Sequence, residues 1–159
     1  MRGVADWLAE TPLAEAMRAS PWLYPIIEIV HITGFCILVG AVAMFDLRVL
    51  GWARALPVTA LGRHLLPWSL GSFALVLPAG LLMFSTQPQA FLANPVFLLK
   101  LSLIALAGIN ALVFHTGVYR SVATWETGQS APFLARCQAV LSIALWLAVI
   151  CCGRLLAYV

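Results

Sequence analysis

Two ionisable side chains, Glu28 and His31, lie three residues apart in the stretch PIIEIVHITGF, which is otherwise almost wholly apolar. A polar side chain in hydrocarbon is costly unless a partner compensates it, so these two residues need partners or a chemical task. Because a histidine beside a carboxylate can exchange protons near neutral pH, the pair is a candidate proton-handling or quinone-contacting site. A structural contact that fixes how helices pack explains the same pair.

Two further cations can meet this pair. At a rise of about 1.5 Å per residue, Glu28 and His31 lie roughly 10 and 15 Å below the start of their apolar segment. Lys100 lies roughly 7 to 8 Å below the start of another segment, and Arg154 enters from the same side. The sequence therefore predicts an outer proton or quinone site of Glu28, His31, Lys100 and Arg154, with an ion pair between Glu28 and Lys100.

The remaining histidines, His64 and His115, suggest a second chemistry. His64 follows the start of one apolar segment and His115 precedes the end of the next, each roughly 6 to 9 Å inside. If the two segments are antiparallel neighbours, both imidazoles lie at the depth that two axial ligands of one haem iron require. Gly71 and Gly108 leave room for a flat porphyrin, although small residues also let membrane helices pack without a cofactor. The sequence thus predicts haem b, with His64 and His115 binding the metal.

The elements that must position these residues are membrane helices. Of the 159 residues, 63% are hydrophobic and 9% are charged, whereas soluble domains have about half and a quarter. Runs long enough to cross a bilayer, about 20 residues each, occur at 21–47, 60–85, 95–119 and 132–157. Ser20 and Asn94, each before a proline, predict two helix starts. We expect an all-α, four-helix transmembrane bundle with up-down topology over 21–159, and an amphipathic N-terminal segment over 1–20.

The arginines predict the orientation. They flank the first and third connections and avoid the second, at Arg48, Arg54, Arg63, Arg120 and Arg136. By the positive-inside rule these two connections are cytoplasmic, which makes the bundle N-out and C-out with residues 1–20 on the periplasmic side. At the end of the first span, Asp46 is expected to pair with Arg63 or Arg136 as a structural lock. Basic patches interleaved with aromatic residues are absent, so nucleic acid is not an expected partner.

Two segments, HITGFCILVGAVAMFDLRVLG and NPVFLLKLSLIALAGINALVFH, resemble a bacterial inner-membrane family of unknown function. The resemblance covers roughly residues 22 to 117 and implies no established activity. It rests on His31, Asp46, Leu47, Arg48, Gly51, Asn94, Pro95, Phe97, Lys100, Asn110, Phe114 and His115.

The architecture is similar, more loosely, to two groups of small bacterial membrane proteins. Cytochrome b561-like bundles bind haem b through histidines and exchange electrons with quinones, but this chain has no histidine in its fourth span. CopD-like copper-resistance proteins are the second group, and the chain lacks the clustered soft ligands that copper(I) selects.

Three functions remain open at this point. The first is a small b-type haem protein of the bacterial inner membrane in quinone-linked electron transfer, with a quinone and a periplasmic redox protein as partners. The second is a transport or metal-handling membrane protein whose path is lined by Glu28, His31 and Lys100. The third is a non-catalytic membrane subunit whose buried charges specify helix pairing. We favour the first.

Overall fold

The computed structural model describes residues 2–158, which form helices and no strand. Four helices are long and apolar enough to cross a membrane: α3 (Leu23–Leu50), α4 (Val58–Thr86), α6 (Pro95–Thr116) and α7 (Phe133–Leu155). Shorter elements are α1 (Arg2–Ala9), α2 (Pro12–Ala19), α5 (Pro88–Ala93) and the 3-10 helix η1 (Val118–Thr124). The prediction of an all-α chain with four membrane-crossing segments is confirmed, and each boundary was predicted to within three residues.

Side-chain capping explains one predicted helix start and not the other. Asn94 caps α6 as predicted, because its side-chain oxygen accepts two backbone N–H groups at 2.9 and 3.4 Å. Ser20 instead ends α2, and its hydroxyl accepts the N–H groups of Trp22 and Leu23, where α3 begins. The first membrane helix therefore begins two residues later than the serine-proline pattern predicted.

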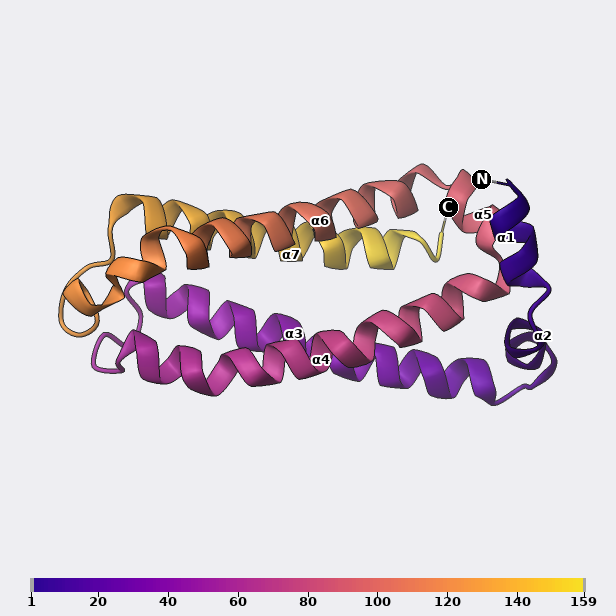
Figure 1. Cartoon of the computed structure of the whole chain (residues 1–159), viewed down its shortest axis with the longest axis horizontal. Helices are drawn as coiled ribbons and strands as arrows, with labels where there is room; N and C mark the ends of the chain where they lie inside the picture. The colour runs from indigo at the N-terminus through magenta and orange to yellow at the C-terminus, as the bar shows by residue number, and fades with distance from the viewer. Residues whose placement is uncertain (1, 159) are drawn as a thin grey trace.

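The long helices pack in the order α4, α3, α7, α6 (Figure 1). Helix α3 lies along α4, α6 lies along α7, and contacts between α3 and α7 join the two pairs. Gly34 allows the close approach of α3 to α4, because a Cβ there would lie 2.9 Å from Cγ2 of Val76. Within the described residues the backbones of α4 and α6 make few close contacts, and the ring of Phe84 on α4 stacks on Phe97 of α6 beside α5, with 5.6 Å between centroids.

The second and third membrane segments are therefore not packed together along their length, as a haem held between His64 and His115 would require. The connection between them is not a tight turn but contains α5, which packs against α1 and α6. This short helix lies between the end of α4 and the start of α6. Sequential helices consequently pair as α3 with α4 and α6 with α7.

The two ends of the bundle differ. Both chain termini lie at one end, which we call the terminal end, together with α1, α2 and α5 (Figure 1). The other end, which we call the loop end, holds residues 51–57 and 117–132. A cluster of buried hydrophobic side chains lies there and comprises Val49, Val58, Phe114, Trp125, Ala131, Ala135 and Ala139. All four long helices contribute to this cluster or to the segments that lead into it, so the loop end is packed.

Arg48 fixes the loop end of α3. Its side chain is only 3% exposed, and Nε donates to the carbonyl of Leu56 at 2.6 Å. Its Nη2 donates to the carbonyls of Glu126 at 2.8 Å and Arg54 at 3.3 Å. A buried guanidinium needs such acceptors. Arg48 thereby ties the first connection to the third, two residues along α3 from Asp46.

Candidate functional site

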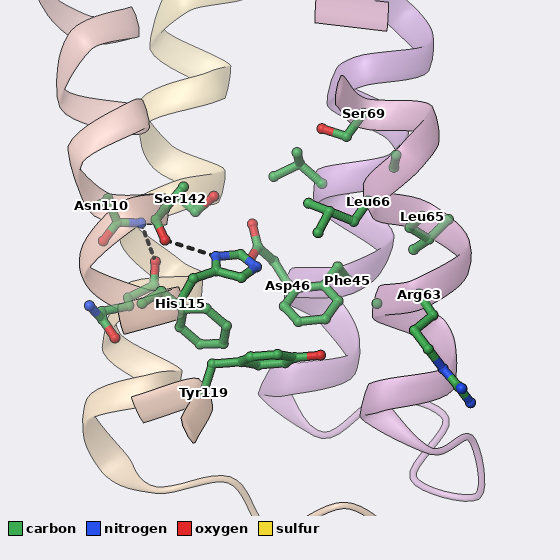
Figure 2. A pocket seen from close by; sticks show the side chains of 16 residues that line it. Phe45, Asp46, Arg63, Leu65, Leu66, Ser69, Asn110, His115, Tyr119 and Ser142 are labelled. Atoms are coloured by element: carbon green, nitrogen blue, oxygen red, sulfur yellow. Dashed lines mark hydrogen bonds between the residues drawn. The ribbon is translucent and has the colours of Figure 1, made fainter. Parts of the chain in front are cut away.

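A cavity of about 200 Å³ lies among the four long helices toward the loop end (Figure 2). Pockets that hold whole drug-sized ligands span about 300 to 1,000 Å³, so this one suits a ring-sized group. Most of the lining is aliphatic or aromatic. The polar side chains that line it include Asp46 from α3, Ser69 from α4, Asn110 and His115 from α6, and Gln138 and Ser142 from α7.

Asp46 is the most unusual of these residues. Its side chain is 7% exposed, and Ser142 of α7 interacts with its carboxylate. Within the described part of the chain, Oδ2 is buried and has no hydrogen-bond partner. The predicted lock with Arg63 or Arg136 is wrong, since both arginines are exposed and Arg63 extends away from the cavity in Figure 2. A buried acceptor left unpaired costs about 1 to 3 kcal/mol, which a ligand that donates a hydrogen bond would offset.

Gln138 adds a second unpaired acceptor. Its side chain is 8% exposed, and its Oε1 is buried without a hydrogen-bond partner among residues 2–158. Its backbone carbonyl accepts a hydrogen bond from Nδ2 of Asn110 at 3.1 Å. This bond joins α6 to α7 beside the cavity, and it uses the Asn110 amide as a donor.

His115 presents a third acceptor. Its Nδ1 lies 2.9 Å from the backbone carbonyl of Ala111. Because a carbonyl can only accept, Nδ1 carries the proton, and the neutral ring then has a lone pair on Nε2. In Figure 2 the ring points from α6 toward α3, on the side where Asp46 lies. The imidazole and the carboxylate therefore border the same cavity from two helices.

Three aromatic rings border the loop-end side of the cavity. The ring centroids of Phe45 and Phe114 are 5.8 Å apart with the planes at 88°. Tyr119 lies 6.2 Å from Phe45 and 5.8 Å from Phe114. Aromatic rings bury large areas and favour edge-to-face or offset contact with another ring. The hydroxyl of Tyr119 lies beside α4, 3.0 Å from where a Cβ would stand on Gly62.

The residues predicted to hold haem lie on two helices whose backbones make few close contacts. His64 on α4 and His115 on α6 are both exposed, and only His115 lines the cavity. Gly71 and Gly108 are also exposed, with no atom close to where a Cβ would stand on either. Two axial ligands must face each other across one iron. A haem held between His64 and His115 stays a prediction.

The residues of the predicted outer site lie toward the terminal end, and they contact different groups. His31 is half-buried between α3 and α4, and its Nδ1 lies 3.0 Å from the carbonyl of Val76. Both Glu28 and Lys100 are near enough to act on His31 electrostatically. Glu28 is exposed on the surface of α3. Glu28, His31 and Lys100 thus lie in the same region of the bundle, but they do not line either cavity described among residues 2–158.

Lys100 and Arg154 face other groups. The Nζ of Lys100 lies 3.9 Å from where a Cβ would stand on Gly153, and Cys152 of α7 is its electrostatic neighbour. The guanidinium of Arg154 is exposed and lies 4.7 Å from the ring centroid of Tyr158, whose hydroxyl it also contacts. Lys100 therefore packs against α7. Its neighbours there are Gly153 and Cys152, and not Glu28 as the predicted ion pair requires.

Several cavity residues were missed by reasoning from the sequence. The signal was present in part, since Gln138 and Ser142 are four apart and so share one face of a helix. Asp46, Asn110 and His115 all occur in the pattern that resembles the bacterial family, but nothing in the sequence alone brought them to one cavity. Comparisons with protein-family models, curated proteins and solved structures find no match to the chain.

Proposed function

We propose that the chain is a multi-pass membrane protein that binds the ring of a quinone in the cavity, as part of quinone-linked electron transfer. One observation carries the proposal: the buried, unpaired Oδ2 of Asp46 borders a ring-sized cavity that also has aromatic side chains in its lining. Ligand pockets combine a mostly apolar wall with a few converging polar groups in this way.

The route of entry supports a lipid-soluble ligand. The lining comes from α4 and α6 as well as α3 and α7, and the backbones of α4 and α6 make few close contacts within the described residues. A molecule dissolved in the bilayer could pass between these two helices while its tail stays in the lipid. The proposal therefore needs no opening through the firmly packed loop end.

We further propose an up-down bundle in the bacterial inner membrane, N-out and C-out. The four apolar helices and the common end of both termini support this arrangement, as do the arginines of the first and third connections. The cavity would then lie near the cytoplasmic face. Asp46 is four residues, or about 6 Å, from the end of α3, so protons from water have a short way to travel.

The proposal assigns His115 to the quinone and contains no haem step. This choice follows from the cavity lining, which includes His115 of α6 and does not include His64 of α4. The loose similarity to cytochrome b561-like bundles then extends to the quinone and not to the haem. Asp46, Asn110, Phe114 and His115, all members of the family pattern, line the cavity.

The test is a binding measurement on the full chain in lipid nanodiscs. A benzoquinone with a short alkyl tail is titrated by calorimetry into the wild type and into Ser69→Leu, which fills the cavity from α4. The matched control is Ser102→Leu, because Ser102 is an exposed serine on α6 outside the cavity. We expect one site per chain, at least tenfold weaker binding for Ser69→Leu, and no change for Ser102→Leu. Absence of binding, or equal binding by all three proteins, would refute the proposal.

A spectrum checks the assignment of His115. A reduced-minus-oxidised visible spectrum of the same preparation should lack a b-type band. A band at about one haem per chain that disappears in both His64→Ala and His115→Ala would restore the haem function predicted from the sequence, and would remove His115 from the quinone site.

A further inference from the structure

We infer that the cavity prefers the reduced, hydroxyl-bearing form of its ligand, the quinol, over the oxidised quinone; this inference rests on the proposed function. A quinone ring carries two carbonyl oxygens, which only accept hydrogen bonds, whereas a quinol ring carries two hydroxyls, which donate. Among the lining residues, the buried side-chain atoms that have no hydrogen-bond partner within the described residues are Oδ2 of Asp46 and Oε1 of Gln138, and both are acceptors. Donor ligands therefore complete the site and acceptor ligands do not.

The acceptors come from three helices. Oδ2 of Asp46 and Oε1 of Gln138 are buried and unpaired within the described residues, and both side chains are more than nine-tenths buried. Nε2 of His115 carries a lone pair when the ring is neutral, because Nδ1 donates to the carbonyl of Ala111. A quinol hydroxyl that donates to the ionised form of Asp46 makes a charge-assisted hydrogen bond, which is stronger than a bond between neutral groups.

The hydroxyl of Ser69 on α4 is one donor at the cavity, and most of the other donors are engaged or turned away. Nδ2 of Asn110 donates to the carbonyl of Gln138, and Ser142 interacts with Asp46. The hydroxyl of Tyr119 lies at Gly62 on α4. The exposed guanidinium of Arg63 extends outward in Figure 2. The carbonyl of an oxidised quinone would thus face Asp46 and Gln138, and few donors would replace the hydrogen bonds that this carbonyl loses from water.

One charge-assisted hydrogen bond that only the quinol forms changes the dissociation constant by at least about tenfold. The experiment uses the full chain in nanodiscs under nitrogen, with a quinol and its matched quinone bearing the same short alkyl tail. Both are titrated into the wild type, into Asp46→Asn, and into Asp6→Asn as the control. Asp6 lies on α1, outside the cavity, and undergoes the same chemical change.

We expect the wild type and Asp6→Asn to bind the quinol at least tenfold more tightly than the quinone. Asp46→Asn should lose this preference, because an amide can turn its NH₂ toward a quinone carbonyl. Equal affinity of the wild type for the two forms overturns the inference and leaves the proposed function intact. If neither form binds and a long-chain alkylammonium ion does, the cavity is a site for organic cations, and both the inference and the proposed function fail. The wild-type comparison decides the matter even if Asp46→Asn does not fold.

Discussion

Replacing Arg48 with methionine tests whether this side chain holds the first and third connections together. Arg48 makes two short hydrogen bonds to backbone carbonyls, at 2.6 and 2.8 Å, and one longer bond at 3.3 Å. A hydrogen bond to a charged group contributes about 1.5 to 3 kcal/mol, so the two short bonds together are worth about 3 to 6 kcal/mol. Relief from burying the guanidinium offsets part of this loss. We therefore expect Arg48→Met to lower the free energy of unfolding by about 3 kcal/mol.

The assay is thermal unfolding in mild detergent, followed by circular dichroism and tryptophan fluorescence. For a chain of this size, about 3 kcal/mol corresponds to a fall in Tm of about 6 to 12 °C. Arg48→Lys should fall by about half as much, since an ammonium is a compact donor that lacks the planar fork of arginine. Arg54→Met is the matched control, because Arg54 is exposed and its side chain makes one bond, to the carbonyl of Gly51.

The expected order of stability is Arg54→Met, then Arg48→Lys, then Arg48→Met. If Arg48→Met loses no more stability than Arg54→Met, the buried guanidinium does not hold the two connections together. A fall in Tm for Arg48→Lys as large as that for Arg48→Met would show that geometry matters and charge does not.

Two other substitutions probe how the helices begin and pack. Gly34→Ala should lower the free energy of unfolding by about 1 to 3 kcal/mol, because its Cβ would meet Val76 at 2.9 Å; Gly40→Ala, on the same helix with open space around it, is the control in the same melting assay. Asn94→Ala should cost about 1 kcal/mol through loss of the helix cap, and Asn94→Asp should retain most of the stability. A stable Gly34→Ala protein would contradict the tight crossing of α3 and α4.

The membrane helices could be predicted from the sequence because they depend on local properties. Length, apolarity and the cap at Asn94 are visible without any knowledge of neighbours. Their order in the bundle was not predictable in the same way, because it depends on which faces fit together. The helix α5, between α4 and α6, is not predicted from the sequence.

The residues of the candidate site could also be predicted only in part. An aspartate and a histidine in apolar segments can be recognised as functional candidates from the cost of burying them. Asp46 is nevertheless predicted to be a structural lock, because Arg63 and Arg136 are expected at the same end of the bundle. Its contact with Ser142, 96 positions away, depends on how α3 and α7 pack. His64 was paired with His115 by depth alone. Depth along a helix is fixed by residue number, but the direction in which a side chain points around the helix is fixed by packing.

The hydrogen bonds of Arg48 also impose an order on the making of the protein. Arg48 and Glu126 are 78 positions apart, so α3, α4 and α6 are all synthesised before the Glu126 carbonyl exists. Until then the guanidinium has acceptors only in its own connection, at Arg54 and Leu56. A growing chain that stops after α6 therefore holds the α3 and α4 pair with one carbonyl still missing from the Arg48 site. The hydrogen bonds of Arg48 at the α3 and α4 pair are complete only when the segment that leads into α7 has been synthesised.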